Sequence, residues 1–322
     1  RSHFCNGQRL HGRWRHDHLI SHNLIEILMN QYDMKGRHAV ITGGATGLGY
    51  AIAERVLASG GSVTIWDRDE AGMAKAVASL KHAGSVHSVQ VDVSQHASVV
   101  AATAATLKIG PVDAVVNCAG ITGPNTQVWN YPVDAWQQVM DVNINGVFYC
   151  CREVVPLMRA QNYGRIVMTT SSSGMYGNFG QSNYGAAKMA VLGFMNTLVL
   201  EGGKNNIHVN ALAPTAGTRM TEDLLPAPVL AVMTPESVTA GALVLCAESA
   251  PTRTILCAGA GGYAKASMYE TDGIFLPVEQ QNPDEIVANW DALSDSSNQQ
   301  ALESGGKQTE KFVMKAMAAL KA

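Results

Sequence analysis

Short β-rich runs alternate with helical patterns along most of this chain. Runs of apolar and β-branched residues predict buried strands, and longer segments with apolar residues on one face predict helices. We expect strands over residues 38–42, 62–66, 86–91, 112–117, 165–169, 207–212 and 253–257. We expect the longer helices over residues 48–58, 70–80, 134–159 and 183–201.

This alternation predicts an α/β fold of the Rossmann type. Strands that alternate with helices form βαβ units, which build a doubly wound parallel sheet between two helical layers, a three-layer αβα arrangement. We expect one such domain over residues 34–262. Residues 263–322 are richer in Gln, Asn, Asp and Ser, with short helical patterns at 283–293 and 310–320. We expect them to form an extension with too few apolar residues for a core of its own.

The first 33 residues differ from the rest of the chain. Five of the ten histidines lie here, mixed with arginines at irregular spacing, and no carboxylate cluster accompanies them. The segment therefore favours no metal site. We expect residues 1–33 to be a leader, disordered or of artificial or upstream origin.

Composition excludes several classes of function. A chain of 322 residues that is 47% apolar can bury one large core. A net charge of -3, without a sustained basic block beyond the N-terminus, argues against a nucleic-acid partner. No apolar run reaches the roughly 18 residues that span a bilayer. The six cysteines lack CxxC pairs and metal-ligand spacing, so we expect no bound metal and a reducing, cytoplasmic compartment.

A glycine-rich turn, Thr42–Gly49, follows the first predicted strand. Glycine lets the backbone approach a pyrophosphate closely at the N-terminus of the following helix. Asp67 ends the second predicted strand, where a carboxylate can bind the adenosine ribose hydroxyls and would repel a 2′-phosphate. The turn predicts a dinucleotide site that favours NAD over NADP, although the neighbouring Arg68 could accept the phosphate.

A tyrosine and a lysine stand four residues apart in the helix predicted over 183–201, at Tyr184 and Lys188. Positions i and i+4 share a helix face, so the phenol and the ammonium can be neighbours. A nearby positive charge favours the phenolate, and lowering a tyrosine pKa from about 10 to about 7 takes roughly 4 kcal/mol. Ser171, thirteen residues before Tyr184, can donate a hydrogen bond to the oxygen that changes charge. Ser172 is the alternative if the register slips.

These motifs together resemble the short-chain dehydrogenase/reductase family over about residues 34–262. The family pattern T-G-x-x-x-G-x-G matches residues 42–49, and its Asn-Asn-Ala-Gly is similar to residues 117–120. Its catalytic residues match Asn143, Ser171, Tyr184 and Lys188. The resemblance implies an NAD(P)-dependent oxidoreductase that interconverts a secondary alcohol and a ketone.

The resemblance also implies individual roles. Tyr184 would be the acid or base, Lys188 would tune it and hold the nicotinamide ribose, and Ser171 would orient the substrate oxygen. Asn143 would hold a water that relays protons from Lys188. The implied cofactor contacts are Gly43, Thr46, Gly47, Leu48, Gly49, Asp67, Asp92, Val93, Asn117, Ala119, Gly120, Tyr184, Lys188, Pro214 and Thr218. A homo-oligomer, dimer or tetramer, packed through the long helices is implied as well.

Two positions depart from the family pattern. Cys118 replaces the second asparagine of Asn-Asn-Ala-Gly, and Thr215 replaces the glycine that often follows Pro214. Neither position performs the chemistry, so the departures concern the geometry of the cofactor site and leave the reaction class unchanged.

The substrate is indicated by a second resemblance. Residues 165–250 are similar to the (3R)-hydroxyacyl-CoA dehydrogenase domain of peroxisomal multifunctional enzymes of type 2, whereas the first half looks more like bacterial NAD-dependent members. We expect a small-molecule substrate, a 3-hydroxyacyl or 3-oxoacyl thioester such as an acyl-CoA. One alternative is a dehydrogenase for a sugar, a steroid or a small diol. Another is a non-catalytic NAD-binding sensor or scaffold.

The segment after the sixth predicted strand, residues 221–235, is expected to form a substrate lid. Its apolar residues are Leu224, Leu225, Val229, Leu230 and Met233. They could line an acyl pocket, and ordinary packing is the equal alternative.

Overall fold

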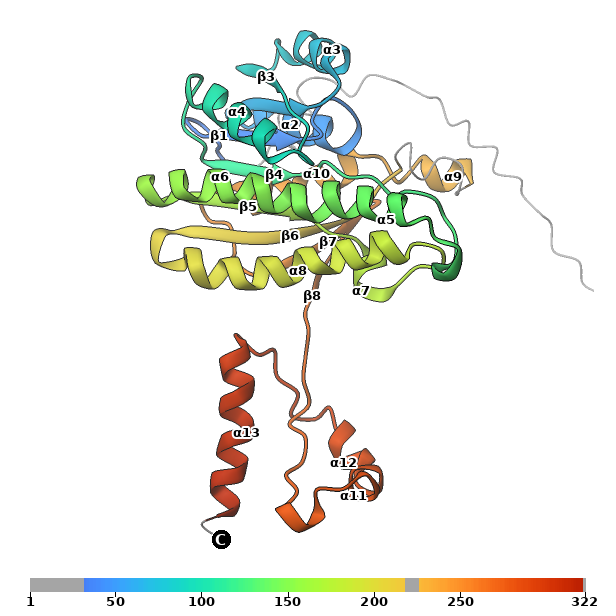
Figure 1. Cartoon of the computed structure of the whole chain (residues 1–322). Coiled ribbons are helices and arrows are strands. Elements are labelled where there is room, and N and C mark those ends of the chain that lie inside the picture. The colour runs from blue at the N-terminus through green and yellow to red at the C-terminus, as the bar shows by residue number, and fades with distance from the viewer. Residues whose placement is uncertain (1–31, 218–225, 321–322) are drawn as a thin grey trace, which may run out of the picture. The chain divides into compact units, whose positions relative to one another are not determined.

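The computed structural model describes residues 32–217 and 226–320, and one eight-stranded sheet organises most of them (Figure 1). The strand order is β3-β2-β1-β4-β5-β6-β7-β8, and all neighbours are parallel except β7 and β8. The strands are β1 His38–Thr42, β2 Ser62–Asp67, β3 Val86–Gln90, β4 Ala114–Asn117, β5 Gly164–Thr169, β6 Ile207–Thr215, β7 Ile255–Gly259 and β8 Gly262–Ala266. The order reverses between β1 and β4, and ligands of such sheets bind at the carboxyl ends of the strands beside that reversal.

Helices cover both faces of the sheet. They are α2 Gly47–Ala58, α3 Glu70–Leu80, α4 His96–Leu107, α5 Val133–Met140, α6 Gly146–Gln161, α7 Ser172–Tyr176, α8 Ser182–Gly202, α9 Ala227–Leu230 and α10 Glu236–Cys246. Residues of α2, α3 and α10 share one buried apolar cluster, and residues of α4, α6 and α8 share the other. In β1, Ala39 and Ile41 join the first cluster and Val40 joins the second, as side chains that alternate across a strand must. The predicted three-layer α/β fold is confirmed.

Most predicted elements are present, with some differences in extent. The helix predicted over 134–159 is α5 and α6 joined by a π-helical turn, Asp141–Asn145. The fourth strand begins at Ala114 rather than at residue 112. The helices α4, α7, α9 and α10 and the antiparallel strand β8 were not predicted.

The C-terminal residues 267–320 form three helices, α11 Pro283–Ala288, α12 Trp290–Ser294 and α13 Gly305–Ala319. An isolated antiparallel bridge joins Glu270 to Gln300, and none of these residues is buried. Ion pairs fix α13 within the segment, since Lys311 pairs with Glu270 and Lys315 Nζ lies 2.6 Å from Asp272 Oδ2. The segment has polar links and no buried core, as its composition indicates.

Among the helices that the structure describes, none combines the length and the apolar character that crossing a bilayer requires.

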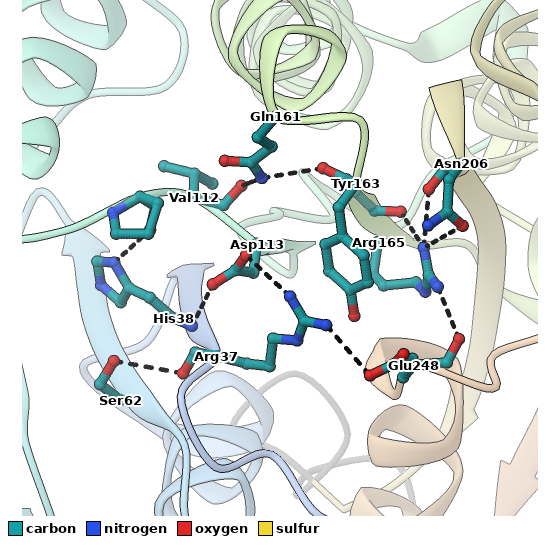
Figure 2. Close-up of polar contacts among 12 residues, drawn as sticks. Arg37, His38, Ser62, Val112, Asp113, Gln161, Tyr163, Arg165, Asn206 and Glu248 are labelled. Atoms are coloured by element: carbon teal, nitrogen blue, oxygen red, sulfur yellow. Dashed lines mark hydrogen bonds and ion pairs between the residues drawn. The ribbon is translucent and has the colours of Figure 1, made fainter. Parts of the chain in front are cut away.

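A polar cluster ties strands together at the amino end of the sheet, opposite the edge where the motifs lie (Figure 2). The guanidinium of Arg37 lies 3.7 Å from the centre of the Tyr163 ring, and that of the buried Arg165 lies 4.3 Å from it. Arg37 Nη2 donates to Glu248 Oε2 at 3.1 Å, and Asp113 Oδ2 accepts the backbone N–H of His38 at 2.9 Å. These contacts join β1, β4, β5 and the end of α10.

The buried His38 makes stability depend on pH. Its Nδ1 lies 2.7 Å from Pro111 O and its Nε2 lies 2.8 Å from Thr64 Oγ1. Burial lowers its pKa below 6.5, opposed by the Pro111 carbonyl and by Asp113. The unfolded chain therefore binds this proton at a higher pH than the folded chain, so the contribution is present above about pH 6.5 and is lost as the pH falls toward the folded pKa.

We expect His38→Gln to flatten the acid side of the stability profile. Over the affected range the wild-type free energy of unfolding should fall by up to about 1.4 kcal/mol per pH unit more than that of the variant. Urea unfolding between pH 7 and pH 5 measures the two slopes. His82→Gln, at an exposed position, is the control and should run parallel to wild type. Parallel curves for His38→Gln would contradict the assignment.

Candidate active site

The glycine-rich turn between β1 and α2 brings backbone against backbone. Gly43 has a φ of +67°, and a Cβ there would stand 2.9 Å from the Cα of Ala119. A Cβ on Gly49 would stand 2.3 Å from the carbonyl oxygen of Gly43. Residues 43–49, which we call the cradle, therefore have no room for side chains at Gly43 and Gly49. They lie at the N-terminus of α2, where backbone N–H groups and the helix dipole favour a phosphate. The shape of the cradle fits the pyrophosphate of a dinucleotide.

The other residues of the turn have different surroundings. Leu48 is buried in the apolar cluster beneath α2, so its backbone rather than its side chain faces the cradle. Thr46 occupies the N-cap position of α2 with an extended backbone, and Gly47 follows with a φ of +58°.

Asp67, the last residue of β2, is fixed beside the cradle. Its Oδ2 accepts a hydrogen bond from the backbone N of Ala45 at 3.1 Å, and its Oδ1 accepts one from the backbone N of Asp69 at 3.1 Å. The carboxylate therefore lies where the adenosine ribose of a dinucleotide is bound in folds of this type.

Thr42, the first residue of the glycine-rich motif, joins the turn to the loop after β4. Its Oγ1 accepts hydrogen bonds from the backbone N of Cys118 and of Ala119, both at 3.0 Å. Asn117, at the end of β4, is buried, and its Oδ1 has no partner among the residues that the structure describes. A buried polar atom without a partner costs about 1–3 kcal/mol. This oxygen is therefore suited to accept a hydrogen bond from a bound group.

For four further predicted cofactor residues, the structure shows no feature that points to a cofactor. The Oδ1 of Asp92 accepts hydrogen bonds from Ser94, from N at 3.0 Å and from Oγ at 2.7 Å, so this carboxylate closes a turn. Val93 is buried, and Pro214 lies near the end of β6. Thr218 lies outside the described residues. Their contacts with a cofactor remain predictions.

Asn143 lies on the π-helical turn between α5 and α6. Its Oδ1 accepts the backbone N–H of Ile121 at 2.9 Å, and its Nδ2 donates to Ile121 O at 2.7 Å. A Cβ on Gly120 would stand 3.2 Å from Asn143 Oδ1 and 3.5 Å from Lys188 Nζ. Gly120, Asn143 and Lys188 therefore meet, and the absence of a side chain at Gly120 keeps the space between them open.

The predicted serine, tyrosine and lysine are brought together. Ser171 caps α7, its Oγ accepts the backbone N–H of Ser173 at 3.1 Å, and it hydrogen-bonds to Tyr184. Lys188 Nζ donates to Thr169 O at 2.8 Å and lies 5.7 Å from the centre of the Tyr184 ring. The alternative Ser172 is exposed, and this geometry favours Ser171.

The expected lowering of the Tyr184 pKa is not found. Burial raises it, the hydrogen bond from Ser171 opposes the rise, and Lys188 is not among the groups that shift it. Lys188 is itself buried, which lowers its pKa from 10.5 to about 8. Tyr184 is consequently a neutral phenol at pH 7, the form that donates a proton to a ketone.

Cys118, one of the departures from the family pattern, lies among these groups. Burial raises the pKa of its thiol to about 11, and the neighbouring Lys188 opposes this rise. The side chain is thus a neutral thiol at pH 7 where the family has a carboxamide. Among the described residues there is no group of three His, Cys, Asp or Glu that could hold a metal ion.

The predicted lid is described only in part. Leu224 and Leu225 lie outside the described residues. A Cβ on Gly217 would stand 3.3 Å from Leu230 Cδ2 and 3.1 Å from Met233 O, so both residues pack against the segment after β6. Val229, on α9, is 39% exposed and remains available to a ligand.

Comparison with known proteins agrees with this geometry. The family model described as short chain dehydrogenase matches residues 37–227. The NAD(+)-dependent 2-dehydro-3-deoxy-L-rhamnonate dehydrogenase of a Sphingomonas species is 39% identical over 239 residues, which is 74% of this chain and 94% of that protein. Mouse peroxisomal multifunctional enzyme type 2 is 36% identical over 275 residues, covering 82% of this chain and 37% of the mouse enzyme.

A solved structure extends the second similarity. Full-length peroxisomal multifunctional enzyme type 2 from Drosophila melanogaster superposes with a TM-score of 0.73 at 28% identity, covering 89% of this chain and 50% of that one. An alignment over 89% of 322 residues must run beyond β8, so it includes part of the C-terminal extension. The present chain thus spans less than half of the mouse enzyme and half of the fly one.

Proposed function

The chain belongs to the short-chain dehydrogenase family, and from that premise we propose that it interconverts 3-hydroxyacyl and 3-oxoacyl thioesters with NAD. The observation that carries this proposal is the structural match to the multifunctional enzyme, because it reaches into the C-terminal extension as well as the sheet. A family likeness confined to residues 37–227 would support an oxidoreductase of this class without favouring a thioester.

The side chains divide the work of proton transfer. Ser171 and Tyr184 would both bond to the substrate oxygen, and Tyr184 Oη gives its proton to a ketone or takes one from an alcohol. A positioned acid or base of this kind contributes about 10²- to 10⁴-fold. Asn143 and Lys188 meet at Gly120, so a water held there could return the proton to the solvent. When bound, the dinucleotide supplies the hydride acceptor or donor.

Asp67 supports NAD as the cofactor. A 2′-phosphate beside its carboxylate would bring two negative charges together, at a place where the ribose hydroxyls of NAD can accept and donate hydrogen bonds instead. Arg68, the next residue, is the group that could offset this repulsion. We therefore expect NAD to be preferred and NADP to be used weakly.

A second candidate is the oxidation of a sugar acid. The relative that acts on 2-dehydro-3-deoxy-L-rhamnonate has the higher sequence identity of the two, 39% against 36%. Its match covers 74% of the chain, less than the 82% and 89% of the multifunctional enzymes, and this favours the thioester. A non-catalytic role is disfavoured because the four predicted catalytic residues are present.

We also propose a cytoplasmic homo-oligomer. All cysteines within the described residues are free thiols, which suits a reducing compartment. The long helices α6 and α8 keep apolar residues at their surface, Phe148 at 44% and Leu200 at 58% exposure, which a second subunit could cover.

The proposed function is tested by following the absorbance of reduced nicotinamide with a substrate panel. The panel holds acetoacetyl-CoA, a 2-dehydro-3-deoxy sugar acid, a steroid ketone and a small diol, each with both dinucleotides. We expect acetoacetyl-CoA with NADH to give the highest kcat/KM. A preference for the sugar acid would replace the thioester assignment, and tight NAD binding without turnover would indicate the sensor.

A further inference from the structure

Gln181 is the residue before α8. The oxygen of its side-chain amide accepts two hydrogen bonds, whereas the nitrogen has no partner among the described residues. Its Oε1 accepts a hydrogen bond from Ser173 Oγ at 2.9 Å and another from Asn178 Nδ2 at 3.2 Å. These two bonds occupy both lone pairs of the oxygen. Within residues 32–217 and 226–320, no acceptor is found for the two N–H groups of Nε2. The orientation of the amide is therefore set, and its donors are available to a ligand.

Gln181 lies close to the reacting centre, because two hydrogen bonds through Ser173 join it to Ser171. It is the N-cap residue of α8, and Tyr184 and Lys188 follow it three and seven residues later, on neighbouring turns of the helix. Lys188 is at the end of this row that meets Gly120, beside the proposed cofactor site. Gln181 is at the opposite end, with Tyr184 between them. A substrate held at its reacting oxygen by Tyr184 and Ser171 would extend away from the cofactor and toward Gln181.

Two hydrogen bonds also couple Gln181 to Ser171. The Oγ of Ser171 accepts the backbone N–H of Ser173 at 3.1 Å, and the Oγ of Ser173 donates to Gln181. Ser173 is buried, its bond to Ser171 is buried as well, and its bond to Gln181 is partly buried. The donor at Gln181 and the donor at Ser171 therefore belong to one rigid unit, which can present two N–H or O–H groups at a fixed separation.

We propose that Gln181 determines specificity by donating a hydrogen bond from Nε2 to a second carbonyl of the substrate, two carbons from the reacting carbon. The selected class is then β-hydroxy carbonyl compounds and the 1,3-dicarbonyls formed from them. The inference rests on the proposed function, in which the second carbonyl is that of the thioester. A 2-dehydro-3-deoxy sugar acid also fits this class. Its ketone is at C2 and its C3 is a methylene, so the carbon that bears the C4 hydroxyl is two carbons from a carbonyl carbon, as in a 3-hydroxyacyl thioester.

The test compares paired substrates in wild type and two variants. One substrate has the second carbonyl, acetoacetyl-CoA or the sugar acid, and the other is a simple cyclic ketone. Gln181→Glu keeps an oxygen that accepts from Ser173 and Asn178 but removes both N–H donors. Gln181→Met removes the acceptor as well as the donors. We expect kcat/KM for the dicarbonyl substrate to fall about 10- to 100-fold in both variants, as loss of a hydrogen bond to a buried carbonyl does. The rate with the cyclic ketone should change less than about threefold.

A binding measurement separates this role from a structural one. Calorimetry of acetoacetyl-CoA with Tyr184→Phe protein, with and without Gln181→Glu, should show weaker binding by the same factor. Ala186→Glu adds an equal charge at an exposed position of α8 and should leave both quantities unchanged.

Equal loss with both substrates, or no loss with the dicarbonyl, would overturn the role of Gln181. If wild type oxidises the sugar acid at its C4 hydroxyl and does not reduce the thioester, the proposed function fails while Gln181 is still tested on the sugar acid. If the thioester is reduced and the variants match wild type, the function stands and the inference about Gln181 fails.

Discussion

Tyr184→Phe is expected to lower kcat by about 10²- to 10⁴-fold while leaving the dissociation constant for NAD within a few-fold of wild type. The substitution removes only the hydroxyl, so the ring that packs at the start of α8 stays. What is lost is the phenolic hydroxyl, the proposed proton donor, which shares a hydrogen bond with Ser171. Steady-state kinetics with the best substrate of the panel and a calorimetric NAD titration measure the two quantities.

Tyr176→Phe is the matched control. Tyr176 lies on α7, near Ser171 in the sequence, and is 75% exposed. The same deletion of a hydroxyl there should leave kcat unchanged. An equal loss in both variants would show a general disturbance of the loop, and full activity of Tyr184→Phe would remove Tyr184 from the mechanism.

The pH profile of the reduction bears on the same residue. Because burial raises the pKa of Tyr184, its proton is present throughout the neutral range. Of Tyr184, Cys118 and Lys188, the group that titrates nearest to neutrality is Lys188, whose pKa is lowered to about 8. A fall in the rate of reduction above about pH 8 would therefore report Lys188 losing its proton, and not the tyrosine.

The sheet could be predicted from the sequence because the information is local. Each of β1, β2, β5 and β6 contains at least three apolar residues within a short segment, and α3 was predicted with its observed ends, Glu70–Leu80. The helix α4 was missed because its run His-Ala-Ser-Val-Val-Ala-Ala-Thr has small residues on all sides and little amphipathic contrast. The strand β8 was missed because five exposed or half-exposed residues become a strand only through pairing with β7.

The candidate site could be predicted as far as its motifs reach. The cradle, Ser171, Tyr184 and Lys188 belong to short sequence patterns, and the fold brings them together. Thr42 belongs to the motif, but its contact with Cys118, 76 residues away, could not be found in this way. The role of Gln181 was also missed, because it depends on Ser173, 8 residues away. The rise in the pKa of Tyr184 could not be predicted either, since spacing on a helix gives proximity to Lys188 but not the extent of burial.

The second large effect is expected from one methyl group in the cradle. A Cβ on Gly49 would stand 2.3 Å from Gly43 O and 2.8 Å from Gly43 C, both backbone atoms that no side-chain rotation can move. Gly49→Ala should therefore displace the turn that receives the pyrophosphate. Overpacking of this kind costs about 1–3 kcal/mol, which corresponds to a roughly 5- to 150-fold weaker affinity for NAD if the cost is borne by the bound state.

Gly193→Ala provides the comparison, because it makes the same chemical change in helix α8 where a Cβ would meet nothing within 4 Å. It should leave NAD affinity unchanged and stabilise the protein by about 0.5–1 kcal/mol, since alanine restricts the unfolded chain and favours the helix. Calorimetric NAD titration and urea unfolding of both variants separate the two consequences. If Gly49→Ala binds NAD as tightly as wild type does, the pyrophosphate is not held by this turn. If NAD affinity falls and the free energy of unfolding is unchanged, the free protein has relaxed the clash at residue 49, and the cost arises only when the cofactor binds.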